Sequence, residues 1–217
     1  MDFILDNFSI VVVAQAHNPS ILNPDFLKVQ GIVDPSFTPS NVICTPPVAQ
    51  VSYKEGITIM AEFQKLQFID AAAERIPFAS PIHDIAIKYI NTLPHVKYTA
   101  VGLNFAGHYL CKDKESALAL LPSKFLKDGE WYSFGDTAPY VGIKFGYLIG
   151  NVRCTINFDT ADNPIHPSKP PSPIIAITSN YHIDSTNIEE MNSFISNWKT
   201  QYDHFLKVVR NTLPEDH

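Results

Sequence analysis

The chain repeats one order of secondary-structure patterns, and this repetition constrains its fold more than any other feature. The first half, residues 1–95, reads as a strand, a short helix, three short strands and a closing helix, at residues 8–16, 21–31, 47–70 and 80–94. The second half repeats this order, at residues 98–110, 113–121, 139–183 and 187–212. The strands are indicated by β-branched or alternating apolar runs, and the helices by apolar residues at spacings of three and four.

Signals at the helix ends support these assignments. Asn23 is placed to cap the first helix, with Pro24 at its first position. Ser80 and Pro81 play the same parts for the helix at 80–94, and Pro122 is expected to end the helix that begins near residue 113. A proline-rich stretch at 163–173 predicts a stiff connection between the last two strands.

Two such halves predict an α+β fold in which one curved antiparallel sheet carries its helices on one face. The order resembles the saddle of the TATA-box-binding-protein fold and the related helix-grip fold; a likeness of topology alone implies no functional residue. The connection "NTLPHVKY" between the halves is short and lacks a flexible composition. We therefore expect a single domain, 1–217, made of two pseudo-repeats, 1–95 and 96–217. Two small α+β domains are the alternative.

The strands of the second half alternate between bulky residues and small or polar ones. In "GLNFAGHY", Leu103 and Phe105 fall on one face of the strand, and Gly102 and Asn104 on the other. Glycine in a strand marks a place where another molecule or backbone approaches, or a place where the sheet bends. The bare face supplies the candidate ligand- or partner-binding residues: Gly102, Asn104, His108, Tyr140, Lys144, Arg153, Asn157 and His182. A merely solvated surface is the alternative.

The last helix carries the longest apolar stripe in the chain. Thr186 and Glu189 predict a capping box at its start. The stripe consists of Ile188, Met191, Ile195, Trp198, Tyr202, Phe205 and Val209. A helix packed on its own sheet is the first interpretation of this stripe, and a partner helix in a heptad seam is the second.

The charge balance bears on possible partners. Sixteen basic residues against twenty-two acidic ones give a formal net charge of −6, and only Arg75, Arg153 and Arg210 are arginines. Phosphate backbones are bound by clustered Lys and Arg, so we do not expect nucleic acid as a partner unless a local basic patch forms.

The cysteines and the N-terminus indicate the compartment. Cys44, Cys111 and Cys154 form no closely spaced pair of the kind that binds zinc or exchanges disulfides. The N-terminus lacks a signal-peptide pattern, and the strongest apolar run, "IVVVA", is too short to span a membrane. These features predict a cytoplasmic protein with free thiols and no membrane partner.

Motifs of the common enzyme classes are absent from the sequence. The phosphate-binding GxxxxGK[ST], the dinucleotide-binding GxGxxG, the nucleophile elbow GxSxG and the zinc-binding HExxH are all missing. We therefore assign no catalytic residue, no metal ligand and no cofactor. A dispersed site that includes His108 and His182 is the enzymatic alternative, because imidazole suits proton transfer near neutral pH.

The segments "NPSILNPDFL", "TPPVAQVSY" and "PHVKYTAVGLNF" resemble a group of uncharacterised bacterial proteins of about this length. That resemblance implies a bacterial origin and no activity. Our first functional hypothesis is a non-catalytic protein-binding or assembly module of a bacterial multi-protein system, which uses the open sheet face, a sheet edge or the last helix to bind a protein partner or a second copy. The second is a small-molecule binder or enzyme with a pocket between helix and sheet. The third is nucleic-acid binding through Lys97, Lys144 and Arg153.

Overall fold

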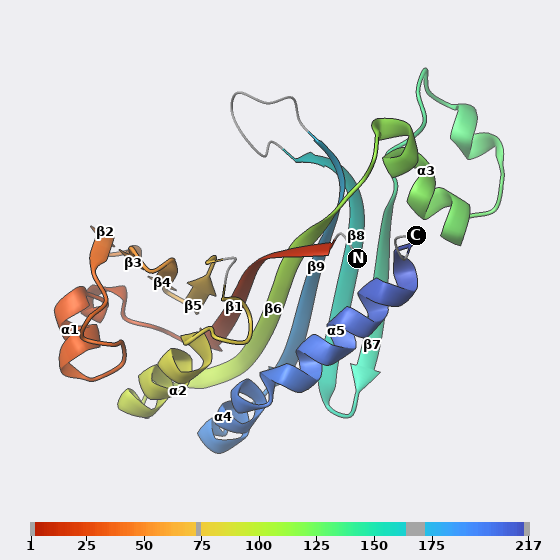
Figure 1. Cartoon of the computed structure of the whole chain (residues 1–217). Helices are drawn as coiled ribbons and strands as arrows, with labels where there is room; N and C mark the ends of the chain where they lie inside the picture. Colours follow the sequence, from red (N-terminus) through yellow and green to blue (C-terminus); the bar gives the residue numbers. More distant parts are fainter. Residues whose placement is uncertain (1–2, 73–74, 164–171, 215–217) are drawn as a thin grey trace.

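The computed structural model describes residues 3–72, 75–163 and 172–214, and within them nine strands form one open antiparallel sheet (Figure 1). The strand order is β2-β3-β4-β5-β1-β6-β9-β8-β7. The strands are β1 (Phe3–Ala14), β2 (Pro39–Cys44), β3 (Val48–Tyr53), β4 (Ile57–Glu62), β5 (Lys65–Asp70), β6 (Tyr98–Leu110), β7 (Gly142–Ile149), β8 (Val152–Asn163) and β9 (Ser172–Asp184). The expected α+β class with an antiparallel sheet is confirmed.

Five α-helices and two short 3₁₀ turns accompany the sheet in the described ranges. The α-helices are α1 (Pro24–Val29), α2 (Ile82–Thr92), α3 (Lys114–Phe125), α4 (Ile188–Ser196) and α5 (Trp198–Thr212). The 3₁₀ turns are η1 (Pro19–Ile21) and η2 (Glu130–Ser133). The central stretch 164–171 of the proline-rich connection lies outside the described residues.

The two long strands β1 and β6 pair at the middle of the sheet. Their register runs from Phe3 opposite Tyr109 to Ala14 opposite Tyr98, with one irregularity between Leu5 and Asn7 and a second at Ala14. On either side of this pair, β5 joins β1 and β9 joins β6. Residues 3–95 and 96–214 thus contribute adjacent parts of the same sheet.

The core lies on the face of the sheet that the helices cover. Alternate residues of the central strands, such as Phe8 on β1 and Phe105 on β6, are fully buried there. These two residues are register partners, and their rings stack with centroids 5.0 Å apart. Trp198 of α5 packs on Phe8 at 5.5 Å, and Phe205 packs on Phe105 at 5.6 Å. Figure 1 shows α4 and α5 running across β6, β9, β8 and β7.

The structure corrects the expectation for the connection after α1. Strand β2 forms at the edge of the sheet, where the sequence pattern predicts only a proline-rich connection. Its residues are mostly exposed and lack the apolar alternation that signals a half-buried strand. The first strand is also longer than expected, since it begins at Phe3.

Three expected helix ends differ from the observed ones. Pro122 lies inside α3 and is buried, so it does not end that helix. The expected C-terminal helix is two helices, α4 and α5, divided at Asn197. The expected capping box at Thr186 is replaced by Asn187, whose side-chain oxygen accepts hydrogen bonds from the backbone N–H groups of Glu189 and Glu190.

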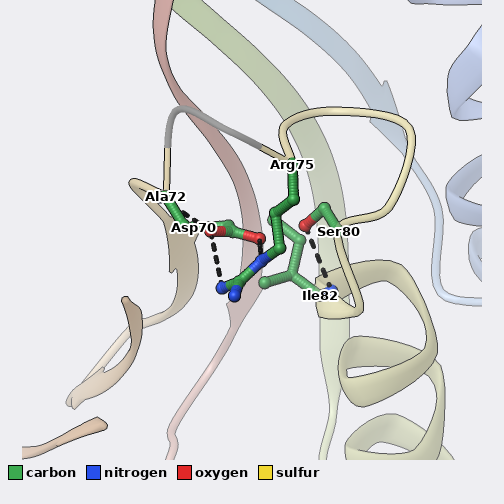
Figure 2. A network of polar contacts seen from close by, with 5 residues as sticks. All are labelled: Asp70, Ala72, Arg75, Ser80 and Ile82. Carbon is green, nitrogen blue, oxygen red and sulfur yellow. Dashed lines mark hydrogen bonds and ion pairs between the residues drawn. The ribbon is translucent and has the colours of Figure 1, made fainter. Parts of the chain in front are cut away.

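A buried ion pair holds the connection from β5 to α2 (Figure 2). The side chain of Asp70 is fully buried at the end of β5. Arg75 donates to both of its carboxylate oxygens, each at 2.9 Å, and the backbone N–H of Ala72 donates to one of them at 3.0 Å. Ser80 accepts a long hydrogen bond of 3.5 Å from the N–H of Ile82 at the start of α2. This network fixes where α2 begins relative to the sheet.

Across the described parts of the chain, every helix is too short or too polar to cross a membrane.

Candidate binding surfaces of the sheet

The strands β6, β9, β8 and β7 bring several candidate residues to one face of the sheet, opposite the helices. Register places Gly102 against His182 and His182 against Arg153. On the same face, the side-chain amide of Asn180 donates to the amide oxygen of Asn104 at 2.7 Å. We call this surface the open face. It has the small and polar character that the sequence alternation indicates.

Hydrogen bonds across strands link the polar side chains of the open face. The amide of Asn157 donates to the hydroxyl of Thr178 at 3.1 Å, and the amide of Asn104 donates to the hydroxyl of Ser9 at 3.4 Å. These polar groups already form hydrogen bonds with one another. A partner that bound them would have to replace those bonds, so it would gain little free energy of binding. The polar groups of the open face therefore mostly bond to one another and are not left free for a binding partner.

Three titratable residues of the open face, Arg153, His182 and Asp184, are also paired with one another. Arg153 contacts the carboxylate of Asp184 at 2.6 Å, and His182 contacts its other oxygen at 2.9 Å. The hydrogen bonds from His182 and then from Arg153 hold the pKa of the Asp184 carboxyl below its usual value. Since Asp184 offsets the charge of Arg153, this pairing weakens the basic patch that nucleic-acid binding requires.

The glycines of this face differ in how much room they leave. A Cβ added at Gly102 would meet the amide nitrogen of Asn180 at 3.1 Å, and one added at Gly142 would collide with the carboxylate of Asp159. At Gly146 nothing lies within 4 Å of that position. Neighbouring side chains therefore fill the space at Gly102 and Gly142, and Gly146 alone of these three leaves it free.

His108 and His182 do not form a common site. His182 pairs across Gly102, and His108 lies six residues further along β6, which separates the two histidines by roughly 20 Å. Nδ1 of His108 instead lies 2.8 Å from a carboxylate oxygen of Asp6, beside the irregularity of β1. The two histidines therefore do not belong to one site.

Tyr140 and Lys144 lie near the outer edge of the sheet. Tyr140 precedes β7, is 56% exposed and has the ammonium group of Lys114 at 5.6 Å from its ring centroid. Lys144 is exposed within β7, where its register partner is Asn157.

The apolar stripe of the C-terminal helices faces the sheet. All of its members from Met191 onward are buried, and Ile188 is partly buried against the same core. The ring contacts of Trp198 and Phe205 with Phe8 and Phe105 show what covers the stripe. These side chains therefore lie in the core and leave no apolar seam at the surface.

Strand β7 forms one edge of the sheet, and part of its surface is apolar and exposed. It pairs with β8 alone, over the whole of its length and without a register shift. Eight of the fourteen large exposed apolar side chains in the described residues belong to β7 or to the segment before it: Phe125, Leu126, Tyr132, Phe134, Tyr140, Tyr147, Leu148 and Ile149. Three of them, Tyr147, Leu148 and Ile149, are consecutive on the edge strand itself.

In this region, only Tyr140 and Lys144 were expected from the sequence to belong to a binding surface. The signal that it missed is the run "YLI" at 147–149, where apolar residues occupy both faces of the strand. A strand covered on one face alternates, so a run without alternation at a sheet edge indicates a second contact surface.

Two cavities lie between the C-terminal helices and the β7–β8 hairpin. One cavity of about 190 Å³ is lined by Ile149, Val152, Tyr181, Thr200, Gln201 and His204. A second, of about 240 Å³, is lined by Asn151, Ile183, Glu190, Ser193, Phe194, Asn197 and Gln201. Gln201 belongs to both. We call the two cavities together the hairpin groove. Neither cavity is lined by His108 or His182.

A polar chain lies beneath the hairpin groove. The hydroxyl of Tyr181 and Nδ1 of His204 are 2.9 Å apart, and the thiol of Cys154 also contacts the Tyr181 hydroxyl. Burial raises the pKa of Tyr181 and raises that of Cys154 to about 11, and burial lowers the pKa of His204. At neutral pH these three groups are therefore uncharged.

A metal site is not formed by the described residues, among which no three His, Cys, Asp or Glu side chains gather closely enough to hold an ion. Compared with known protein families and with curated proteins, the chain matches none.

Proposed function

We propose that this chain is a non-catalytic assembly module that associates with a second copy of itself through the outer edge of β7. The observation that carries the proposal is an eight-residue edge strand that exposes apolar side chains and lacks the usual protection against pairing. It contains no proline and no register shift, and its single charge is Lys144. Edge strands of monomeric proteins are normally blunted by such features.

The opposite edge of the sheet shows the contrast. Strand β2 begins with Pro39, which lacks a backbone donor, and its pairing with β3 shifts register between Pro39 and Asn41. Bulges and prolines of this kind discourage pairing with another chain. Only β7 therefore offers an uninterrupted edge.

The sequence of β7 complements itself when two copies run antiparallel. Residues directly opposite each other in an antiparallel pair lie on the same face of the sheet. In a symmetric pair of β7 strands, one residue must therefore face its own copy across the two-fold axis. If Gly146 faces its own copy, Phe145 of one copy lies opposite Tyr147 of the other on the helix-covered face. Lys144 then lies opposite Leu148 of the other copy on the open face. Like charges then stay apart, whereas an axis through Lys144 would oppose two lysines. At that axis Gly146 faces its own copy, and no other side chain lies within 4 Å of the place that a side chain would take there.

The contact would extend beyond the backbone hydrogen bonds. Phe125 of α3 packs against Phe145 with ring centroids 5.5 Å apart, and Phe145 in turn stacks on Tyr147 at 6.2 Å. The exposed side chains of this cluster continue the apolar surface of β7 toward α3. Aromatic residues at the centre of a contact supply most of the energy of association.

Two substitutions of opposite charge at Leu148 test whether the copies associate through β7 and whether Gly146 lies at the axis. Leu148 is 73% exposed, so neither substitution disturbs the core. We expect the wild-type chain to be a dimer by light scattering after size exclusion. Leu148→Lys places a second positive charge opposite Lys144 and should weaken the dimer about tenfold or more, whereas Leu148→Glu places a carboxylate there and should preserve it.

Val29→Lys is the matched control, because Val29 is 81% exposed on α1, in the half of the chain that does not contain β7. It should leave the dimer unchanged. A monomeric wild-type chain at high micromolar concentration would overturn the proposal. Equal weakening by Leu148→Lys and Leu148→Glu would overturn the register through Gly146.

We further infer that the two halves arose from one duplicated unit, as the repeated sequence order suggests. The pairing supports this: the first strand of each half pairs with the last, β1 with β5 and β6 with β9. A meander then runs outward in each half, through β4 and β3 or through β8 and β7. This order also supports the resemblance to a TATA-box-binding-protein-like saddle.

A further inference from the structure

A groove lies between α3 and the 3₁₀ turn η2 that follows it. Its volume is about 410 Å³, and its lining residues are Ala119, Pro122, Ser123, Leu126, Asp128, Gly129, Trp131 and Tyr132. The first four of these recur at spacings of three and four, so they form one stripe along α3 and its end. The others belong to the segment that follows α3. We call this cavity the α3 groove.

Two aromatic rings line the α3 groove. The rings of Trp131 and Tyr132 meet edge to face, with their centroids 5.5 Å apart. The indole N–H of Trp131 donates to the backbone carbonyl of Lys127 at 3.1 Å, which holds the indole ring in place. A Cβ at Gly129 would lie 2.8 Å from that ring, so only glycine leaves room for it. Grooves lined by aromatic rings are the sites at which proline-rich segments bind to other proteins.

The charge of the α3 groove also points to its occupant. Asp128 is the only charged residue in its lining, and it forms no ion pair with any of the described residues. The nearby ammonium group of Lys124 is engaged elsewhere, because it donates to the backbone carbonyls of Asn211 and Thr212. An apolar groove with one unpaired carboxylate favours an occupant that combines apolar surface with a positive charge.

The sequence of the chain contains one segment of this chemistry. Residues 164–171, "PIHPSKPP", lie outside the described residues, and their only formal charge is that of Lys169. Pro164, Pro167 and Pro170 recur at every third residue. A polyproline II helix has three residues per turn, so in that conformation the three prolines share one side. A segment that favours this conformation loses little entropy when it binds.

We propose that the α3 groove binds the proline-rich segment 164–171 of a second copy of the chain. The prolines pack against the rings of Trp131 and Tyr132, and Lys169 pairs with Asp128. The argument is one of complementary chemistry, because the groove supplies aromatic rings and a carboxylate, and the segment supplies prolines and an ammonium group. This contact goes beyond the proposed pairing of β7, since neither the groove nor the segment belongs to that strand.

A synthetic peptide with the sequence of residues 163–173, blocked at both ends, tests the proposal on the full chain. We expect a dissociation constant below about 1 mM. In NMR spectra the indole N–H signal of Trp131 should shift, and that of Trp198 should not, because Trp198 is buried in the core. The same peptide with Lys169→Glu should bind about fivefold more weakly, as expected for loss of an exposed ion pair.

A charge reversal in the groove tests the predicted pair. The variant Asp128→Lys should prefer the Lys169→Glu peptide over the native one. Asp136→Lys is the matched control: Asp136 is exposed and does not line the groove, so the preference for the native peptide should persist. Asp128 is exposed as well, so neither substitution disturbs the core.

Three results would overturn the proposal. They are no binding of the native peptide at 1 mM, a shift of the Trp198 signal without one at Trp131, and the same peptide preference in Asp128→Lys as in Asp136→Lys. Leu148→Lys separates this contact from the pairing of β7, because Leu148 does not line the α3 groove. This variant should bind the native peptide as tightly as the wild-type chain does, whether or not the wild-type chain pairs through β7.

Discussion

At the scale of the residue, we expect the stability of the fold to depend strongly on the buried ion pair of Asp70 and Arg75. The Asp70 side chain is fully buried and that of Arg75 is 23% exposed. Arg75→Met leaves the carboxylate buried with only the N–H of Ala72 as a partner. We expect the free energy of unfolding to fall by about 3–5 kcal/mol, measured by urea denaturation, because an uncompensated buried charge is costly.

Two further variants separate loss of the pair from loss of packing. Asp70→Asn combined with Arg75→Met removes the charge as well, so this double variant should lose less stability than Arg75→Met alone. Lys65→Met removes the exposed pair with Glu62, in which both side chains are about 40% exposed, and should cost less than about 1 kcal/mol. Equal losses from Arg75→Met and Lys65→Met would show that burial does not govern the Asp70 pair.

The ion pair of Asp70 and Arg75 can be predicted in part from the sequence. In "KLQFID" the alternation places Leu66, Phe68 and Asp70 on one face of β5, so a carboxylate stands where the pattern requires a core residue. A buried Asp needs a cation nearby, and Arg75 is one of only three arginines. The turn that brings the two together depends on the connection to α2, which local patterns do not specify.

At the scale of the element, periodicity predicted the strands well and their ends less well. The bounds of β6 were predicted correctly, as a run of thirteen residues that ends before the polar segment at 111–114. The division of the last helix at Asn197 was not predicted. The apolar spacing of three and four continues across Asn197, so the stripe alone gives no sign of the division.

Pro122 shows how burial overrides a local rule. A proline inside a helix removes one hydrogen bond and is commonly where a helix ends. Here Pro122 and its neighbour Leu121 are both buried, and the helix continues to Phe125. Local propensity cannot predict such a case, because the compensation comes from side-chain packing.

The stripe of α5 has a measurable role at this scale. Phe205 is fully buried and contacts the rings of Phe3, Phe105 and Tyr202. Phe205→Ala should lower the free energy of unfolding by about 3–5 kcal/mol, because it removes apolar burial and leaves a cavity between α5 and β6. Thermal and urea unfolding followed by circular dichroism would measure the loss.

Lys207→Ala, at an exposed position of the same helix, is the control and should change stability by less than about 0.5 kcal/mol. If Phe205→Ala were as mild as Lys207→Ala, α5 would not be docked on the sheet in solution. The stripe would then be available to a partner helix, which was the second interpretation of its sequence pattern.

At the scale of the whole molecule, the sequence predicted which residues share a face of the sheet more readily than which neighbouring side chains fill the space on that face. Alternation alone placed Gly102 and Asn104 opposite Leu103 and Phe105. Whether the space beside Gly102 is free depends on the register with β9, which brings Asn180 and His182 against it. The exposed edge of β7 depends likewise on strand order, because the same sequence paired on both sides would be ordinary core.

The joined halves lead to a prediction about cooperativity. One contiguous core runs through both halves, and Phe8 and Phe105 stack across the β1–β6 boundary. A side-chain hydrogen bond of 2.8 Å from Asn192 on α4 to Asn91 on α2 also links the halves. Neither half therefore keeps a complete core without the other, and we expect a single unfolding transition. Its calorimetric enthalpy should be about 150 kcal/mol near 60 °C, equal to the van't Hoff enthalpy per cooperative unit.

A substitution at the boundary sharpens this test. Phe105→Ala removes the ring that stacks on Phe8 and contacts α5, so it should shift the whole calorimetric peak to lower temperature while leaving it single. Two separate folding units would behave otherwise, because the variant would lower one peak and leave a second at the original temperature. A split peak, in the variant or in the wild-type chain, would show that the shared sheet does not couple the halves and would favour two small α+β domains.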